Sequence, residues 1–251
     1  MRKAFVILLL VVAGFLYYNI FVHERVPQDI VTYRFDFDEM DKDFWLVSEW
    51  ENFSRAYDTV KLEGGTLKLS ADVTGIMPYM LSKPLELQSK DVLTIKRRVK
   101  ISHGTGTFEG GLALYQTTDL ELVPEKSDGS WFTAMGDGIV LVEYSYDLMS
   151  TSVRPGRDVI RFLAADWEYN DNYTLITPIY DEWVEETLIF DMRSNQMTYK
   201  LGDKEYKLYS YRLDKSAVRV LMHAYGSGSG NVIELDYVEI TIEDKGSKRG
   251  L

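Results

Sequence analysis

The chain has 251 residues, a formal net charge of −11 and no cysteine. The excess of acidic side chains repels phosphate backbones and argues against nucleic acid as a partner, while the lack of cysteine excludes disulfides, thiolate catalysis and cysteine-ligated zinc. Hydrophobic residues make up 45% of the chain, which is enough for one sizeable core, and a chain of this length suits one all-β domain without a second.

The first predicted element is a membrane anchor at residues 4–22. This run contains no charged side chain, and as a helix rising about 1.5 Å per residue it would span about 28 Å, close to the hydrocarbon thickness of a bilayer. It ends in Tyr17-Tyr18-Asn19-Ile20-Phe21, without the small residues of a signal-peptide cleavage site. Arg2 and Lys3 favour a cytoplasmic N-terminus. We therefore expect residues 1–30 to form a retained transmembrane helix and a short linker at the cell membrane, with the remaining chain extracytoplasmic; a cleaved signal peptide is the alternative.

From residue 31 onward, apolar and polar side chains alternate, which is typical of half-buried β-strands. Leu67, Leu69 and Ala71 share one face of the first clear example. The stretch 93–101 alternates in the same way, except that Arg97 interrupts its apolar face. Further strands, most of them rich in β-branched or aromatic residues, are predicted at 112–116, 139–146, 159–164, 185–191, 197–201, 205–209, 218–225 and 232–242.

Turn-forming sequences separate these segments, and Leu201-Gly202-Asp203-Lys204 predicts a tight hairpin. Many short strands without a strong amphipathic helix predict an all-β fold, a two-sheet antiparallel jelly-roll sandwich. We expect this domain at residues 31–244, preceded by the one transmembrane helix and followed by a polar tail at 245–251.

Three stretches of this domain carry a family resemblance: FDFDEMDKDFWLVSEWENFSRAYDTVKLEGGTLKLS at 35–70, YDEWVEETLIFDMRSNQMTYKL at 180–201 and GSGSGNVIELDYVEITI at 226–242. An opening segment leads into a G-x-L-x-L strand, a tryptophan strand runs into a hairpin, and the last strand carries an Asp before alternating apolar residues. This pattern resembles the concanavalin A-like lectin/glucanase superfamily. The resemblance implies a jelly roll of two antiparallel sheets, a concave face that often receives saccharides and, in some members, a structural calcium ion.

The last strand also contains Glu234, Asp236 and Glu239, whose spacing resembles the catalytic strand of family 16 glycoside hydrolases. The resemblance implies Glu234 as nucleophile, Asp236 as the residue that orients it and Glu239 as acid/base, in a retaining mechanism that needs two carboxyl groups about 5–5.5 Å apart. Without a β-bulge, Glu239 would face away from Glu234. Because the motif lies near the end of the chain, whereas the hydrolases place it mid-chain, we expect no catalytic residue and keep these three as the alternative.

A structural calcium ion is the one cofactor that the resemblance implies. Asp36 and Asp38, near the expected first strand, would provide oxygen ligands together with Asp236 of the last strand. A solvated acidic turn is the competing interpretation.

Aromatic side chains in polar stretches are the candidate carbohydrate-binding residues, because pyranose rings stack on tryptophan and tyrosine while neighbouring polar groups bind the hydroxyls. The candidates are Trp131, Trp167, Tyr169 and Tyr173. The tryptophans in apolar-patterned segments are expected in the core instead: Trp45, Trp50 and Trp183.

The three histidines, His23, His103 and His223, are too scattered in sequence to indicate a zinc site. We expect each of them to be structural or solvent-facing.

Three functions remain open. The leading hypothesis is a membrane-anchored, lectin-like module that binds a glycan of the cell surface or envelope. A family-16-like glycoside hydrolase is the second and requires Glu234, Asp236 and Glu239 to share one face. The third is a non-catalytic module that docks an envelope protein through an exposed apolar patch.

Overall fold

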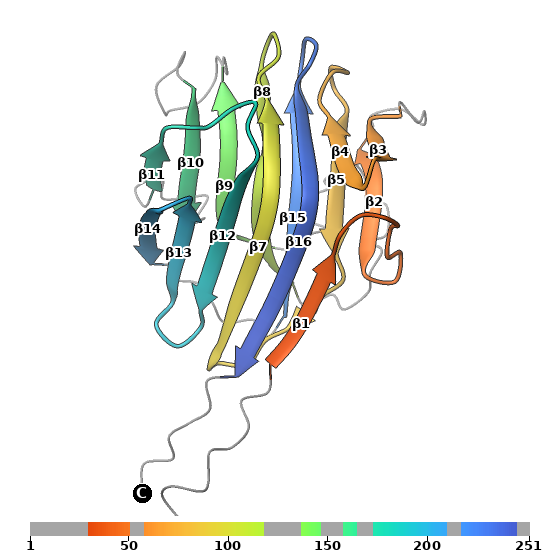
Figure 1. Cartoon of the computed structure of the whole chain (residues 1–251). Helices are drawn as coiled ribbons and strands as arrows, with labels where there is room; N and C mark the ends of the chain where they lie inside the picture. Colours follow the sequence, from red (N-terminus) through yellow and green to blue (C-terminus); the bar gives the residue numbers. More distant parts are fainter. Residues whose placement is uncertain are drawn as a thin grey trace, which may run out of the picture.

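The computed structural model describes residues 30–50, 58–117, 137–146, 158–164, 173–209 and 217–244, without the side chains of 48–50, 117 and 137–139. These residues form two antiparallel sheets stacked face to face (Figure 1), which confirms the predicted all-β sandwich. No helix within these ranges is long and apolar enough to cross a membrane. The transmembrane helix predicted at 4–22 and the tail predicted at 245–251 lie outside the described residues, so both stay predictions.

Sheet A runs in the order β14-β13-β12-β7-β16-β4-β3, and β1 pairs with β16 beside β4. Its strands are β14 (Lys204–Tyr209), β13 (Gln196–Leu201), β12 (Val184–Asp191), β7 (Asp91–Ser102), β16 (Val232–Asp244), β4 (Thr66–Ser70), β3 (Val60–Glu63) and β1 (Ile30–Phe35). Strands distant in sequence therefore lie side by side.

Sheet B runs in the order β11-β10-β9-β8-β15-β5-β2, and β6 pairs with the beginning of β15. Its strands are β11 (Tyr173–Ile176), β10 (Val159–Ala164), β9 (Asp137–Tyr146), β8 (Phe108–Thr117), β15 (Ala217–Gly226), β5 (Met77–Ser82), β2 (Trp45–Trp50) and β6 (Leu85–Glu86). Every paired strand in both sheets is antiparallel to its neighbours.

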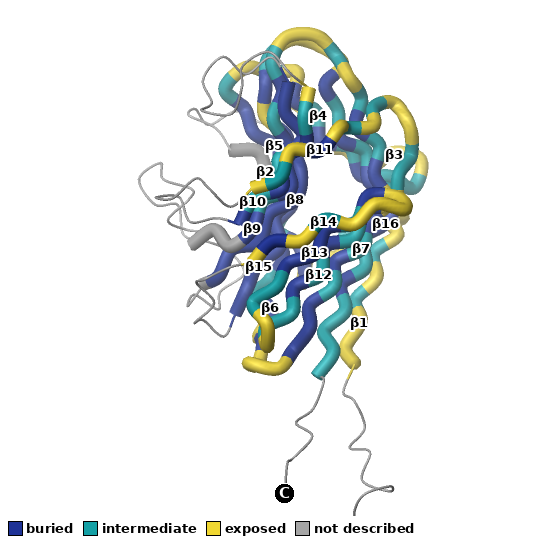
Figure 2. Tube along the Cα trace, turned by 90° about the vertical axis from the view of Figure 1, so that its left-hand side faces the viewer, coloured by how far each residue is buried: buried dark blue, intermediate teal, exposed yellow. Residues whose placement is uncertain are grey.

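The hydrophobic core lies between the sheets, where buried segments of both face each other (Figure 2). Leu93, Ile95 and Val99 of β7 point inward and belong to the same buried cluster as Val142 of β9 and Phe162 of β10. This confirms the period-two interpretation of 93–101. It also means that the even-numbered positions of β7 lie on the outer face of sheet A.

Arg97, the residue that interrupts the apolar face of β7, points into this core. Its side chain is 0% exposed and lies 2.6 Å from the carboxylate of Glu186, which is 1% exposed. The two residues are register partners on β7 and β12, and Tyr144 of β9 donates a hydrogen bond to the other oxygen of Glu186. A matched ion pair therefore lies inside the sandwich on sheet A, and the hydrogen bond from Tyr144 links it to sheet B.

Every strand predicted from the alternating pattern is present, and the predicted hairpin is confirmed by the pairing of Leu201 with Lys204 and by the left-handed backbone of Gly202, φ 56°. The shorter strands β2, β3, β5, β6 and β11 were not predicted. In β5, Pro78 interrupts the sequence pattern of a strand. The strand β6 has only two residues and is too short to show alternation.

Three tryptophans were expected in the core, and the structure agrees with this expectation only in part. Trp45 is 2% exposed, which confirms it as core, while the side chain of Trp50 lies outside the described residues. The core prediction is wrong for Trp183, which is only half-buried and lies against Arg98 and Lys100, each 5.3 Å from its ring centroid. Arg98 is exposed on the outer face of sheet A, where the indole ring gains cation–π contacts.

Candidate functional site

The central strands of sheet B are buried on both faces, although only one face meets sheet A. In β15, for example, nearly every position is buried, whichever face it points to. The outer face of sheet B, turned away from sheet A, carries a small apolar cluster of Leu81, Ala113, Tyr115 and Leu221. It also carries ionisable side chains, and a charge buried where it does not hold the two sheets together is a candidate functional group.

These ionisable side chains form a row across the sheet. Arg161 of β10 pairs in register with Glu143 of β9, Glu143 with Gly111 of β8, Gly111 with His223 of β15, and His223 with Tyr79 of β5. Because register partners in antiparallel strands share a face, all five positions look outward.

Gly111 leaves an opening in the middle of this row. Glu143 and His223 approach each other across it, with Nε2 of His223 3.7 Å from Oε1 of Glu143. A Cβ atom at Gly111 would lie 2.1 Å from the carbonyl oxygen of Val142, so any larger residue would push β8 away from β9.

Glu109 completes the cluster from the neighbouring row of β8. Nη2 of Arg161 contacts carboxylate oxygens of both Glu109 and Glu143. The Glu143 side chain is 3% exposed and that of Arg161 11%, whereas that of Glu109 is 28% exposed. Glu109 is therefore the member of the charged cluster that a ligand can reach most directly.

Burial, followed by the negative charge of Glu143, raises the pKa of Glu109 to about 8. One guanidinium faces two carboxyl groups, so a proton on Glu109 relieves the excess negative charge at neutral pH. The cluster thus presents a neutral carboxyl group next to the ion pair of Arg161 and Glu143.

His223 is 6% exposed, so it is buried and not solvent-facing. Burial lowers its pKa to about 4, against an opposing effect of the Glu109 charge. The imidazole is therefore neutral at pH 7, and its Nδ1 has no hydrogen-bond partner among the described residues; the same holds for Nε of Arg161. Unsatisfied buried polar atoms in a native protein point to a missing partner.

Tyrosines border the cluster. Tyr225, the register partner of Glu109 on β15, is 37% exposed, and Tyr79 continues the row beyond His223. Arg219 lies further along β15, opposite Tyr115, and donates a hydrogen bond to the carbonyl oxygen of Ser82. An exposed ring beside a carboxyl group suits a ligand with both apolar and hydroxyl surfaces.

Of the aromatic residues predicted to bind carbohydrate, Trp131, Trp167 and Tyr169 lie outside the described residues. Tyr173 begins the edge strand β11, is 43% exposed and pairs with Leu163. It therefore lies on the same sheet as the charged cluster but near its edge, and its role stays a prediction.

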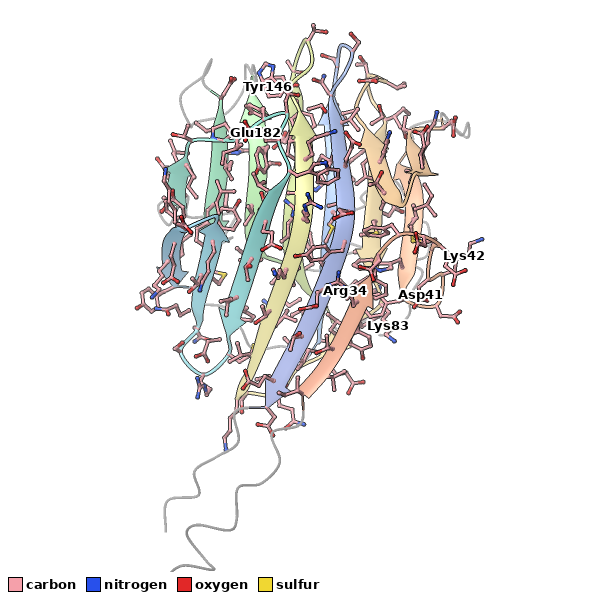
Figure 3. The ribbon with its side chains drawn as sticks, in the orientation of Figure 1. Arg34, Asp41, Lys42, Lys83, Tyr146 and Glu182 are labelled. Carbon is pink, nitrogen blue, oxygen red and sulfur yellow. The ribbon has the colours of Figure 1, made fainter. Side chains whose placement is uncertain are left out.

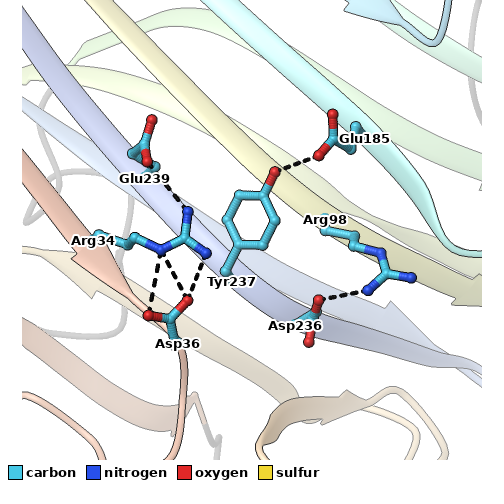
Figure 4. Close-up of polar contacts among 7 residues, drawn as sticks. All are labelled: Arg34, Asp36, Arg98, Glu185, Asp236, Tyr237 and Glu239. Atoms are coloured by element: carbon cyan, nitrogen blue, oxygen red, sulfur yellow. Dashed lines mark hydrogen bonds and ion pairs between the residues drawn. The ribbon is translucent and has the colours of Figure 1, made fainter.

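The three carboxylates of the hydrolase alternative lie on sheet A. The register of β16 against β7 shifts between Leu235 and Tyr237, so Asp236 forms a bulge. Glu234, Asp236 and Glu239 consequently face the outer side of sheet A together, as that alternative requires. Figure 4 shows Asp236 and Glu239 on this face.

Each of these carboxylates, however, is already matched by a cation. Glu234 pairs with Lys100 at 2.5 Å, Asp236 with Arg98 at 2.8 Å, and Glu239 with Arg34 at 3.3 Å. Lys100 belongs to β7 and Arg34 to β1, which flank β16 on opposite sides. Glu234 also lies 3.8 Å from Lys68 of β4, so both glutamates of the hydrolase alternative are engaged by basic side chains.

The predicted calcium ligands are also engaged elsewhere. Asp36 lies 2.8 Å from Arg34, and Asp236 is held by Arg98. Among the described residues, no three histidine or acidic side chains are grouped to hold a metal ion. The residues present, Asp38 included, do not fit a calcium site in this arrangement, and the ion stays a prediction of the resemblance alone.

Sequence reasoning missed Glu109, Glu143 and Arg161. A signal was present, because Glu143, Arg161 and His223 are ionisable residues inside strands that consist mostly of apolar or aromatic residues. Alternation alone assigns such residues to a solvent-facing side. It does not reveal that four neighbouring strands place them in one buried cluster.

No family model matches this sequence, and no curated protein matches it. Solved structures do resemble it. An acidic lectin from winged bean, complexed with methyl-α-D-galactose, is 10% identical with a TM-score of 0.59, over 86% of this chain and 99% of the lectin.

Two further structures extend the comparison. The carbohydrate recognition domain of Emp46p, in a potassium-bound form, is 14% identical with a TM-score of 0.58, over 82% of this chain and 94% of that one. An endo-1,3-β-glucanase from Streptomyces sioyaensis is 11% identical with a TM-score of 0.55, over 86% and 97% of the two chains. At this identity the likeness establishes the fold alone. The chain has the concanavalin A-like fold that lectins and glucanases share, as the sequence resemblance implied.

Proposed function

We propose that this protein binds a carbohydrate on the outer face of sheet B, at Glu109, Glu143, Arg161 and His223. The observation that carries the proposal is the placement of a buried charged cluster on the face that does not meet sheet A. Charges between the sheets, such as Arg97 and Glu186, stabilise the sandwich, whereas these charges lie where a ligand could take part in their hydrogen bonding.

The chemistry of the cluster supports a polyhydroxylated ligand. A protonated carboxyl group, a carboxylate, a guanidinium and a neutral imidazole together donate and accept hydrogen bonds in several directions. The exposed ring of Tyr225 beside Glu109 adds a surface for the CH face of a sugar. The winged bean lectin of the same fold is complexed with a galactoside, which favours the proposal by analogy.

The proposal includes a membrane tether. The uncharged run at 4–22, preceded by Arg2 and Lys3, supports a single crossing with the domain on the extracytoplasmic side. The outer face of sheet B would then be displayed to glycans of the cell surface or envelope.

A glycan array probed with the full-length protein in detergent, with and without calcium, tests the proposal. We expect Tyr225→Ala and Arg161→Gln to weaken binding by about tenfold or more, since each removes a direct contact. Tyr209→Ala is the matched control, because Tyr209 is 53% exposed but belongs to β14 of sheet A. Binding that both site variants leave unchanged would place the glycan elsewhere, and silence across the array would favour the protein-docking hypothesis.

Glycoside hydrolysis is a second candidate at the same cluster. Two carboxyl groups contact one guanidinium nitrogen. The raised pKa of Glu109 keeps this carboxyl group protonated at neutral pH, while Glu143 forms an ion pair with Arg161. Glu109 would protonate the leaving oxygen. Turnover of a bound glycan that Glu109→Gln abolishes and Glu239→Gln spares would establish this reaction, while binding without turnover would reject it.

A further inference from the structure

A separate cavity of about 550 Å³ opens at the end of the sandwich where β1 begins and β16 ends. It lies between the sheets, with β1, β16 and β7 of sheet A on one side and the segment around β6 of sheet B on the other. Figure 2 shows β1 and β6 at this same end. None of the residues of the outer-face cluster lines this cavity.

Apolar and aromatic side chains form part of the cavity wall, and polar residues form the rest. Val31 and Tyr33 of β1, Ile242 of β16, and Leu85 and Leu87 from the β6 segment contribute to its lining. Leu85 and Leu87 are buried, whereas Val31 is 45% exposed. The buried leucines therefore form a floor, and Val31 lies at the mouth.

Three acidic residues line the cavity and make it negatively charged: Glu86, Asp91 and Asp244. Asp91 of β7 is 5% exposed, and its Oδ2 accepts a hydrogen bond from the backbone N–H of Gln88 at 2.8 Å. Among the described residues, its Oδ1 has no hydrogen-bond partner and no cationic side chain forms an ion pair with it. Asp244, which also lines the cavity, is the register partner of Asp91.

A buried carboxylate is costly without a countercharge, and Asp91 is such a group at the edge of a partly apolar space. A positively charged group at this position would offset the charge of Asp91, and the apolar part of the cavity wall would receive an apolar body.

We propose that this cavity binds a small cationic amphiphile, with its ammonium group at Asp91 and its alkyl or aryl body among Tyr33, Leu85 and Leu87. The volume lies in the range of about 300–1,000 Å³ that is usual for small-molecule pockets. The site is independent of the carbohydrate proposal, because it lies on the inner side of the sheets.

Hexylamine, 1-hexanol and hexanoate test the charge preference on the full-length protein, since they share one body and differ in the head group. Isothermal titration calorimetry measures binding, with a titration into protein-free micelles as the blank. Hexylamine should bind at one site, at least about tenfold more tightly than 1-hexanol or hexanoate. Equal affinity for hexanoate would overturn the proposal.

Asp91→Asn tests the residue that carries the argument. Asparagine keeps an oxygen that can accept from Gln88 but removes the charge, so we expect hexylamine binding to weaken by about tenfold. Asp203→Asn, in the exposed turn between β13 and β14, is the matched control and should bind as the parent does.

Val31→Trp adds a second test that does not touch the buried acid. The larger side chain at the exposed mouth should block hexylamine while leaving glycan binding at sheet B unchanged. Retained hexylamine binding in both Asp91→Asn and Val31→Trp would disprove the site, whichever way the glycan experiment turns out.

Discussion

Arg97 and Arg161 are both deeply placed arginines, but they face different surroundings. Arg97 points between the sheets and holds one carboxylate, that of Glu186. Arg161 points away from sheet A and shares one nitrogen between Glu109 and Glu143. The first arrangement is balanced in charge, although Nη1 and Nη2 of Arg97 have no hydrogen-bond partner among the described residues. The second has one acid too many, which a proton or a ligand must offset.

The outer face of sheet A provides a third case, in which opposite charges are matched in contact with solvent. Arg34 projects from β1 over this face (Figure 3) and contacts Asp36 and Glu239. Its guanidinium also lies 4.4 Å from the ring centroid of Tyr237. Such exposed pairs are screened by water and add little stability. The three regions therefore predict three sizes of effect when charge is removed.

The largest expected effect comes from breaking the matched pair in the core. Glu186→Gln leaves Arg97 charged and buried without a countercharge, so we expect the free energy of unfolding to fall by about 3–5 kcal/mol. Urea denaturation followed by far-UV circular dichroism measures the change.

The double variant Arg97→Met with Glu186→Leu is the control for this prediction. It removes both charges and should recover most of the lost stability, because a well-packed apolar pair can replace a buried ion pair. A double variant no more stable than Glu186→Gln would mean that the hydrogen bond from Tyr144, and not the charge balance, dominates this region.

The unmatched cluster should reveal itself through pH. Glu109 has a pKa of about 8 in the folded protein against its ordinary value of 4.5, so the folded state holds a proton that the unfolded state releases. The stability from that proton is present below about pH 4.5 and is lost as the pH rises toward 8. Between pH 6.5 and 8 we expect the free energy of unfolding to fall by about 1–3 kcal/mol in the parent, and much less in Glu109→Gln. Parallel slopes would contradict the raised pKa.

His223 should act in the opposite direction at lower pH. Its pKa is about 4 when folded against an ordinary value of 6.5, so the unfolded state binds the proton first on acidification. Stability is therefore lost as the pH falls from about 6.5 to 4, by about 2–3 kcal/mol. His223→Gln should flatten this part of the profile, measured as the thermal midpoint across pH. A variant that keeps the parent slope would show that other groups cause it.

The fold could be predicted from the sequence because strand alternation survives in most of the chain. The inner face of β7 is marked by Leu93, Ile95 and Val99 alone. The hairpin between β13 and β14 is marked directly by Gly202-Asp203. The two edge-region strands β3 and β11 were missed, since short strands show too few repeats of the period. The order of the strands in each sheet could not be predicted from the sequence, because β8, for example, lies beside β15, more than a hundred residues later in the chain.

The candidate site was far less predictable than the fold. Glu109, Glu143 and Arg161 come from three strands, and only the register that aligns Arg161, Glu143 and Gly111 brings them together. The Glu234–Glu239 motif could be found in the sequence because all of its residues lie on one strand. Local sequence patterns therefore reveal candidate sites within a strand, and they miss candidate sites built across strands.

The smallest expected effect belongs to the motif strand itself. Asp236→Asn removes the partner of Arg98 on the outer face of sheet A, where the side chains are 36% and 45% exposed. We expect the free energy of unfolding to change by about 0–1 kcal/mol, because exposed pairs gain little over hydration. Urea denaturation beside Glu186→Gln measures both on one scale. If Asp236→Asn instead costs as much as the core variant, the bulge of β16 depends on this ion pair, and charge matching on the surface of sheet A contributes to the fold as much as it does in the core.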